Sequence, residues 1–344
     1  QKVEKSTRVK ARVKAHALRE IMLTHDKIFV MGHKNPDADC VGAALGIYRL
    51  SKTLGKSTYI VMDKDCPAIE PIVEGIYKER ADEEEDIFVT NEEALLLKDK
   101  SAMLIVVDVN LPAMTECPEL LKSVSTIVVL DHHRQNNETI KNAVVSYVEP
   151  YASSTCEMVA EILQYIVDKP KLKNIEADAM YSGILVDTDN FVIKAGVRTF
   201  EAAAFLRRAG ADVTRVRKMF REDMEHCRIR TAIINKAEIY MDEFAISTFD
   251  GANVSGATVV GAKAANALLN IQGIRGSFVL TSLQDCIYIS ARSIDELNVQ
   301  VIMEKFNGGG HLTMAAAQLK DVTLEEAKQQ LEDVLQQMRE DGDI

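Results

Sequence analysis

The sequence contains no tryptophan, and aromatic residues make up only 6% of it. It has no excess of positive charge either, because 52 acidic residues outnumber 41 basic residues and give a formal net charge of −11. Proteins that hold long nucleic acid need a positively charged groove, commonly with aromatic side chains on which bases stack. We therefore expect no binding of long nucleic acid. An anionic substrate would need locally placed cations, from metals or from individual Arg and Lys side chains.

Cysteine pairs and long apolar runs are absent as well. The six cysteines are scattered and form no CxxC pair, which argues against a zinc site or disulfide framework and favours a reducing cytosol. No apolar run approaches the roughly 18–20 residues needed to cross a bilayer, and no signal peptide is visible. Because the chain begins at Gln1 rather than Met, we expect a cytoplasmic piece of a longer protein that itself makes no membrane contact.

The apolar segments that are present predict two α/β domains. In residues 19–212, short apolar segments alternate with helical ones, which is typical of a parallel, doubly wound sheet. Before this domain we expect a basic linker helix over residues 1–18. After it we expect a connector helix over 213–236 and a smaller α/β domain over 237–344. The strands expected in the first domain are Lys27–Met31, Ser57–Val61, Ala102–Val107, Ser125–Leu130 and Ala143–Val148.

Carboxylates and imidazoles gather at the ends of these expected strands, where open α/β sheets bind ligands. Manganese and magnesium prefer carboxylate oxygens, and manganese also accepts imidazole. A binuclear hydrolase needs about six or seven such ligands, with one carboxylate bridging ions roughly 3.5–4 Å apart. The sequence therefore predicts a two-metal phosphoesterase site. The groups in question are His33, Asp37, Asp39, Asp108, Asp131, His132, His133 and Asp187.

Several of these residues also have a plain structural interpretation. Asp37 and Asp39 could form a loop and cap the helix that follows, and Asp108 could be an ordinary turn residue. Asp187 is a better ligand candidate than Asp189, which looks like a turn former together with Asn190. Cys40 is interpreted as a small packing residue, although a thiol so close to metals could be sensitive to oxidation.

Two further segments could contact phosphate. Glycine permits the dihedrals by which backbone N–H groups form a phosphate-binding nest, and Gly308, Gly309 and Gly310 are the most glycine-dense point in the chain. The alternative is an ordinary loop. Arg292 could clamp a phosphate with two hydrogen bonds, or it could be a plain surface arginine. The segment Ser153–Glu157 has the pattern of a capping box, and the alternative is a helix N-terminus that points its N–H groups at a phosphate.

Taken together, these motifs resemble those of the DHH phosphoesterase superfamily. The histidines and aspartates named above are similar to its four metal motifs. The segment Gly308-Gly309-Gly310-His311, with Arg292 upstream, is similar to the DHH-associated domain of its nuclease and phosphodiesterase branch. The wider phrasing, such as MGHKNPDAD and LDHHR, resembles the cyclic di-AMP phosphodiesterases of the GdpP type.

The resemblance implies a role for each site residue. Asp108 would bridge two manganese ions, or two magnesium ions as the alternative. Asp131 would orient an imidazole, and His133 would lie near the scissile phosphate. The second domain would grip the substrate, which places the expected active site in the cleft between the domains. One ion would be held by His33, Asp37 and Asp108, the other by Asp39, Asp108, His132 and Asp187, and the substrate by His133, Arg292, Gly308, Gly309, Gly310 and His311.

The resemblance also implies an activity. A water activated by the two metals would hydrolyse cyclic di-AMP to linear pApA, with a slower second cut to AMP, so the partners would be cyclic di-AMP and short linear dinucleotides. It further implies a homodimer and a parent protein anchored in the bacterial membrane by helices upstream of this chain. Two alternatives stay open. An oligoribonuclease of the same superfamily would prefer pApA or pAp, and a non-catalytic sensor would bind cyclic di-AMP without turnover.

Overall fold

The computed structural model describes residues 2–81, 86–168, 170–294, 296–310 and 312–344. Contacts divide the chain into two compact units, Gln1–Arg221 and Glu222–Ile344. Among the described helices, none is both long enough and apolar enough to span a bilayer.

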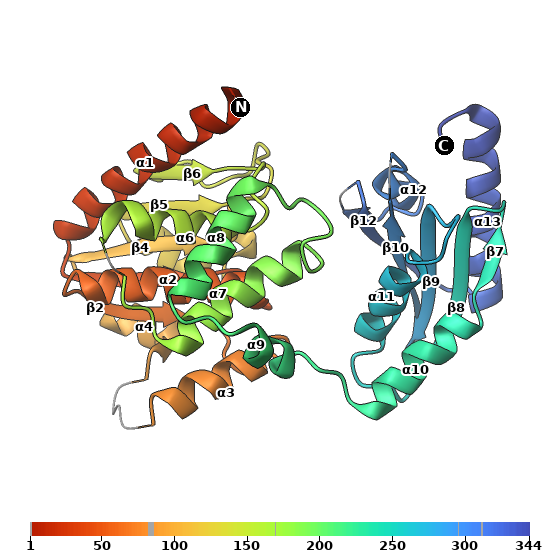
Figure 1. Ribbon diagram of the computed structural model, residues 1–344, viewed down its shortest axis with the longest axis horizontal. Coiled ribbons are helices and arrows are strands. Elements are labelled where there is room, and N and C mark those ends of the chain that lie inside the picture. The colour runs from red at the N-terminus through yellow and green to blue at the C-terminus, as the bar shows by residue number, and fades with distance from the viewer. Residues whose placement is uncertain (1, 82–85, 169, 295, 311) are drawn as a thin grey trace. The chain divides into compact units, whose positions relative to one another are not determined.

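The first unit is built on a six-stranded sheet with the order β3-β2-β1-β4-β5-β6, and all neighbouring strands are parallel (Figure 1). This confirms the predicted parallel, doubly wound sheet. The strand order reverses between β1 and β4, and in open α/β sheets ligands bind at the carboxyl ends beside such a switch point. The strands are β1 (Lys27–Met31), β2 (Ser57–Val61), β3 (Phe88–Val89), β4 (Ala102–Val107), β5 (Thr126–Asp131) and β6 (Val145–Val148).

Helices cover both faces of this sheet because its strands are apolar on both sides. All six residues of β4 are buried. Met103, Ile105 and Val107 belong to the core under α1, α2, α6 and α7, whereas Leu104 and Val106 belong to the core under α4 and α5. The helices of this unit are α1 (Lys2–Leu23), α2 (Ala38–Thr53), α3 (Glu70–Glu79), α4 (Asn91–Leu97), the short 3₁₀ helix η1 (Pro112–Met114), α5 (Pro118–Ser123), α6 (Thr155–Ile166), α7 (Asn174–Asp187), α8 (Val197–Arg208) and α9 (Val213–Met219).

The expected linker helix over residues 1–18 and the expected connector helix over 213–236 both differ in the structure. Helix α1 extends past the expected residues 1–18 and packs beside β6 and α6 (Figure 1). Its buried residues Ala11, Ala15, Leu18 and Met22 recur at helical spacing on one face, so α1 is part of the first unit's core. Where we expected one connector helix over 213–236, the structure has α9 and then α10 (Met224–Asn235), which starts anew with Asp223 as its N-cap.

The second unit holds a mixed sheet with the order β11-β12-β10-β9-β8-β7, in which only β8 and β9 are parallel. One core lies under α12 and α13 and another under α10 and α11, which confirms a smaller α/β fold. The elements after α10 are β7 (Glu238–Tyr240), β8 (Phe244–Asp250), α11 (Ala257–Leu268), β9 (Gly276–Leu283), β10 (Cys286–Ser293), α12 (Val299–Glu304), β11 (Gly309–Gly310), β12 (Met314–Lys320) and α13 (Leu324–Asp341).

Candidate metal centre

Six acidic and imidazole side chains converge at the carboxyl end of the first sheet. His33 Nε2 lies 3.5 Å from Asp108 Oδ2 and 3.8 Å from Asp37 Oδ1. His132 Nε2 lies 3.1 Å from Asp187 Oδ2, 3.5 Å from Asp108 Oδ1 and 3.7 Å from Asp39 Oδ2. Asp108 therefore presents one carboxylate oxygen to each of two donor groups. The structure brings together the six residues that the sequence singled out as ligands.

The local backbone explains how these side chains reach one place. Asp108 directly follows β4 with a left-handed φ of 61°, a conformation that aspartate adopts more readily than most residues. Asp37 caps α2 by accepting a hydrogen bond from the backbone N–H of Cys40 at 2.9 Å, so its capping role and its place in the cluster coexist. Asp187 is the last residue of α7, and Asp189 and Asn190 make the left-handed turn after it.

The cluster carries an excess of buried negative charge. Burial and the Asp39 carboxylate raise the pKa of Asp108 well above its usual range, and the same two causes raise the pKa of Asp187 to about 6. Burial by itself would lower the pKa of His132, but hydrogen bonding to Asp187 and the charge of Asp39 raise it to about 10. Asp108 and Asp37 likewise overcome burial and raise the pKa of His33. Each shift indicates that positive charge is favourable here.

This donor set fits divalent cations. Buried carboxylates that crowd one another are costly unless a cation lies between them, and oxygen with imidazole nitrogen is the mixture that manganese accepts. Among the described residues, the ligand atoms of Asp39, His132 and Asp187 lie within 4.8 Å of one another, as do those of His33, Cys40 and Asp108. Asp108 belongs to the second group and also lies 3.5 Å from His132 of the first, so each group would hold one ion.

Metal binding should therefore release protons. A metal ion binds neutral imidazole, and below its raised pKa of about 10 His132 carries a proton when no metal is bound. The dissociation constant for Mn²⁺ should rise as pH falls from about 8 to 6, by about tenfold per pH unit for each displaced proton. Calorimetry in buffers of different protonation enthalpy measures that release directly. A binding heat that does not depend on the buffer would contradict the prediction.

The N-terminus of α6 fixes two of the candidate ligands, which the sequence did not reveal. Backbone N–H groups of Thr155 and Cys156 donate to the two carboxylate oxygens of Asp39 at 2.7 and 2.8 Å. The Thr155 hydroxyl donates to Asp108 Oδ1 at 2.9 Å. Ser154 caps the helix as expected. These N–H groups are already bound to Asp39, so the alternative in which they hold a phosphate does not match the structure.

Thr155→Val should weaken Mn²⁺ binding by about tenfold or more, the usual effect of removing a partner that orients a metal ligand. Valine has the shape of threonine but cannot donate to Asp108. The matched control is Thr155→Ser, which keeps the hydroxyl and should retain most of the affinity. The electron paramagnetic resonance signal of free Mn²⁺ gives the bound fraction for each variant. Equal affinities for the valine and serine variants would show that the hydroxyl has no such role.

His133 lies beside the cluster with its outer nitrogen available. Its Nδ1 is 2.8 Å from Asp131 Oδ1, so Asp131 is the acceptor that fixes the tautomer with Nε2 directed elsewhere. Burial would raise the pKa of Asp131, but its hydrogen bond with His133 lowers it. Asn110 donates to the other Asp131 oxygen at 2.6 Å. With 44% of its side chain exposed, His133 can reach a ligand in solution.

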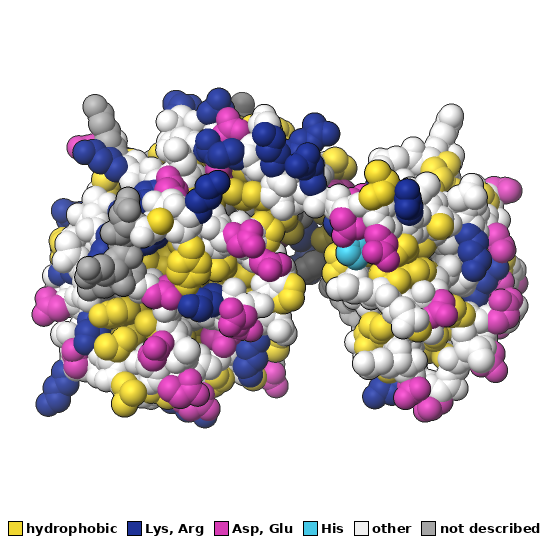
Figure 2. Space-filling view, turned by 90° about the horizontal axis from the view of Figure 1, so that it is seen from below, with side chains coloured by type: hydrophobic (Ala, Val, Ile, Leu, Met, Phe, Trp, Pro, Cys, Tyr) yellow, Lys and Arg dark blue, Asp and Glu magenta, His cyan; other side chains and the backbone are white. Residues whose placement is uncertain are grey.

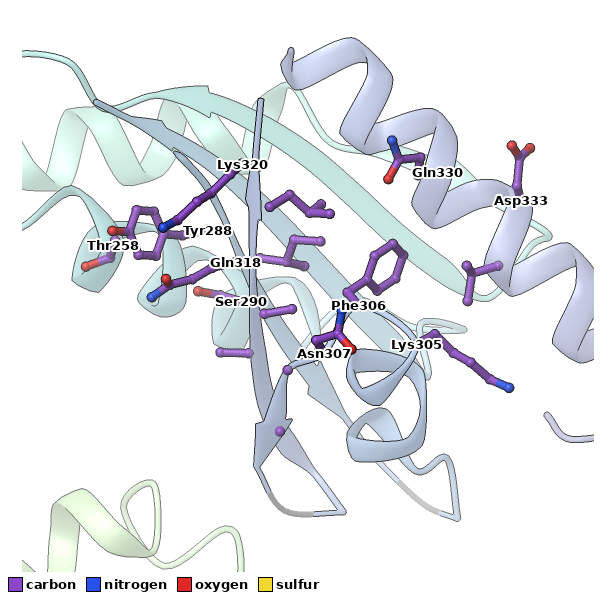
Figure 3. Close-up of a pocket in the computed structure, with 17 residues that line it drawn as sticks. Thr258, Tyr288, Ser290, Lys305, Phe306, Asn307, Gln318, Lys320, Gln330 and Asp333 are labelled. Atoms are coloured by element: carbon purple, nitrogen blue, oxygen red, sulfur yellow. The ribbon is translucent and has the colours of Figure 1, made fainter. Parts of the chain in front are cut away.

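The substrate-binding residues expected in the second unit separate into two places. Gly308 and Gly309 line a cavity of about 1070 Å³, together with Asn307 and residues of β10, β12 and α13. In Figure 3, Tyr288, Gln318 and Lys320 lie on the same side as Thr258, while Asn307 lies near Phe306. A Cβ at Gly308 would lie 2.2 Å from the carbonyl oxygen of Ala316, whereas one at Gly309 would meet nothing within 4 Å. Packing therefore requires glycine at 308, and also at 310, where φ is 150° and a Cβ would lie 2.4 Å from the Met314 carbonyl oxygen, but not at 309.

Arg292 and Gly310 do not line this cavity among the described residues. Arg292 Nε donates to Asn266 Oδ1 at 2.8 Å, and Nη1 donates to the Ala291 carbonyl at 2.9 Å, which fixes its guanidinium against α11. Gly310 pairs with Ala315 in the short β11–β12 ladder. His311 lies outside the described residues.

The surface carries charges of both signs. On the face shown in Figure 2, acidic and basic side chains are interspersed over each unit, with apolar side chains between them. Lys and Arg side chains are most dense along the upper edge of the first unit in this view.

Each unit of the chain matches a known domain family. Residues 27–184 match the DHH family, N-terminal domain, and residues 247–340 match the DHHA1 domain. Cyclic-di-AMP phosphodiesterase PdeA of Listeria monocytogenes serotype 1/2a is 43% identical over 332 residues, which is 96% of this chain and 50% of that protein. The chain thus spans about half the length of the curated relatives it matches.

Two solved structures share the fold. An exopolyphosphatase-related protein from Bacteroides fragilis is 20% identical with a TM-score of 0.76, covering 95% of this chain and 96% of that chain. RecJ from Thermus thermophilus, in complex with Mn²⁺, is 15% identical with a TM-score of 0.53, covering 94% of this chain and 54% of that one.

Proposed function

Because the chain belongs to the DHH family, with a DHHA1 domain after its DHH domain, we propose that it is a phosphodiesterase that hydrolyses cyclic di-AMP with two manganese ions. One observation carries the proposal. Asp108 presents a different oxygen to each imidazole. Its Oδ2 lies 3.5 Å from His33 Nε2, and its Oδ1 lies 3.5 Å from His132 Nε2. The name of the Listeria monocytogenes relative supports cyclic di-AMP as the substrate, and homodimerisation stays a prediction.

The protein's own side chains would hold and orient the reacting groups. When bound, the two metal ions would supply a water activated for attack on phosphorus. They would also place positive charge beside the phosphate oxygens. Asp131 accepts a hydrogen bond from His133 Nδ1, which leaves Nε2 on the other side of the ring. An imidazolium, which carries a proton on both nitrogens, would donate from Nε2 to a non-bridging phosphate oxygen. Thr155 and the N-terminus of α6 keep Asp39 and Asp108 in place while charge builds on the phosphate.

The products follow from which bond breaks. Water adds to phosphorus and the 3′ oxygen of one ribose leaves, so one phosphodiester of cyclic di-AMP is opened and linear pApA with a free 3′-hydroxyl is formed. A second cut of the same kind would convert pApA to AMP. We propose that this second step is slower.

The test is product analysis with cyclic di-AMP, cyclic di-GMP, pApA and pAp, each with and without Mn²⁺. We expect manganese-dependent conversion of cyclic di-AMP to pApA as the fastest reaction. Faster turnover of pApA or pAp would favour the oligoribonuclease. Tight binding of cyclic di-AMP without turnover, although Mn²⁺ is bound, would favour the sensor, and either result would overturn the proposal.

Arg292→Ala should raise KM for cyclic di-AMP by about tenfold or more with little change in kcat, because hydrogen bonds to a charged group contribute about 1.5–3 kcal/mol. Its guanidinium is held by Asn266, so it is oriented before substrate arrives. The control is Arg275→Ala, since Arg275 pairs with Glu243 in the same unit. Steady-state kinetics separates the two parameters. An unchanged KM for the Arg292 variant would remove Arg292 from the substrate site.

A further inference from the structure

Cys40 contributes a sulfur atom to the metal cluster. It lies in the first turn of α2, between the ligand segment and the helix core, and its exposed fraction is 0%. Its sulfur rests against the backbone of Gly32, where a Cβ would lie only 2.0 Å from Sγ. Gly32 directly precedes His33. The position of the sulfur is therefore fixed by the chain that carries His33.

The sulfur lies near two donor atoms, from His33 and Asp108, that the proposed function assigns to one ion. The ligand atoms of His33, Cys40 and Asp108 lie within 4.8 Å of one another. His33 Nε2 is also 3.8 Å from Asp37 Oδ1. One imidazole nitrogen, one carboxylate oxygen and one sulfur thus form a close group, and the Asp37 carboxylate lies beside it, next to His33. Four donors of these types are a complete tetrahedral set for zinc.

The same place would treat hard and soft ions differently. Manganese and magnesium prefer oxygen and nitrogen ligands and bind a thiol weakly. Thiolate sulfur prefers softer ions such as zinc. Catalytic zinc sites keep one coordination position open for water, and sites with four protein ligands do not. A thiophilic ion held by all four donors would leave no position for water on that ion.

We propose that Cys40, with His33, Asp37 and Asp108, forms a binding site for a thiophilic divalent cation that displaces the catalytic ion and inactivates the enzyme. Binding forms a metal–sulfur bond, and the thiol proton leaves to solvent, so no oxidant or reductant is needed. This inference rests on the proposed metal site. It adds that the site discriminates poorly against zinc-like ions because of one sulfur atom.

The test uses Co²⁺ as a spectroscopic substitute for zinc. One equivalent of Co²⁺ added to the metal-free protein should produce a thiolate-to-cobalt charge-transfer band in the near ultraviolet, and Zn²⁺ should abolish it. Cys40→Ala and Cys40→Ser should both lack the band. Cys156→Ala is the matched control, because Cys156 is also fully buried and close by but its sulfur donates to the Asp39 carbonyl at 3.3 Å. This variant should keep the band.

Inhibition gives a second measurement. Zn²⁺ should inhibit manganese-supported hydrolysis at a concentration at least about tenfold lower in the unmodified protein than in Cys40→Ala, the scale expected for losing a group in the metal's coordination environment. If Mn²⁺ binds but the first equivalent of Co²⁺ gives no thiolate band, the sulfur site is refuted and the proposed function stands. If Mn²⁺ itself does not bind, the proposed function and this inference fall together. A band that persists in both Cys40 variants also refutes the assignment.

Discussion

Asp108→Asn should lower cyclic di-AMP hydrolysis by roughly a thousandfold or more. A metal pair contributes several kcal/mol of charge stabilisation in the transition state, and each 1.36 kcal/mol changes a rate tenfold. Asparagine has the size of aspartate but only one oxygen, so it cannot present a carboxylate oxygen to both ions. The two ions, one beside each imidazole that lies 3.5 Å from Asp108, would lose their shared carboxylate. The bound Mn²⁺ should fall below two per chain.

Asparagine is the sharper substitution because of the backbone at this position. Asp108 has a φ of 61°, a conformation that asparagine tolerates and alanine does not. Asparagine can also still accept the hydrogen bond from Thr155. The control is Asp321→Asn, since Asp321 is exposed and has a φ of 58°. Metal stoichiometry and turnover are measured for both variants. Full activity with two bound ions in Asp108→Asn would exclude the bridging role.

Gly42→Ala should lower the free energy of unfolding by about 1–3 kcal/mol, the usual cost of overpacking a core. In an ordinary helix this change would stabilise by up to about 1 kcal/mol, because glycine is a poor helix former. At Gly42 the sign reverses. A Cβ there would lie 2.6 Å from the carbonyl oxygen of Ala179 and 2.7 Å from Cys156 Sγ. The first of these is backbone of α7, which cannot turn aside.

Denaturant unfolding of the isolated chain measures this loss, with the first unit's transition followed in the presence and absence of Mn²⁺. Gly196→Ala is the control, because a Cβ at Gly196 would meet nothing within 4 Å. That change should cost less than about 1 kcal/mol, through loss of a preferred N-cap residue. A stabilised Gly42→Ala variant would mean that α2 and α7 can separate without penalty.

The sequence predicted the first sheet well because its strands are short, apolar and bounded by polar turns. Lys27–Met31, Ser57–Val61 and Ala102–Val107 form strands with the expected bounds. The two-residue strand β3 was not predicted, because Phe88–Val89 is too short to show a period. The break at residues 220–223 was missed for a different reason. No glycine or proline marks it, and Asp223 caps α10 only through a local hydrogen bond.

Predicting the candidate ligands was possible because parallel strands end at the same edge of a sheet. His33 and Asp108 follow β1 and β4, which are neighbours, so their place in the chain already indicated their place in space. Thr155 and Cys40 gave no such signal. Threonine beside a helix start suggests a cap, and a single buried cysteine suggests packing, so neither residue type points to a metal by itself.

Residue types and spacing by themselves determined the parallel sheet, the smaller second fold and the list of carboxylates and imidazoles, because these depend on local periodicity and on strand ends. Tertiary structure decided which atoms face which. It alone shows that Asp108 lies 3.5 Å from both imidazoles and that the N-terminus of α6 donates hydrogen bonds to Asp39. It also shows that the sulfur of Cys40 lies near His33 and Asp108. These are contacts between segments far apart in the chain. Their geometry depends on how closely α2, α6 and α7 pack, which no local pattern specifies.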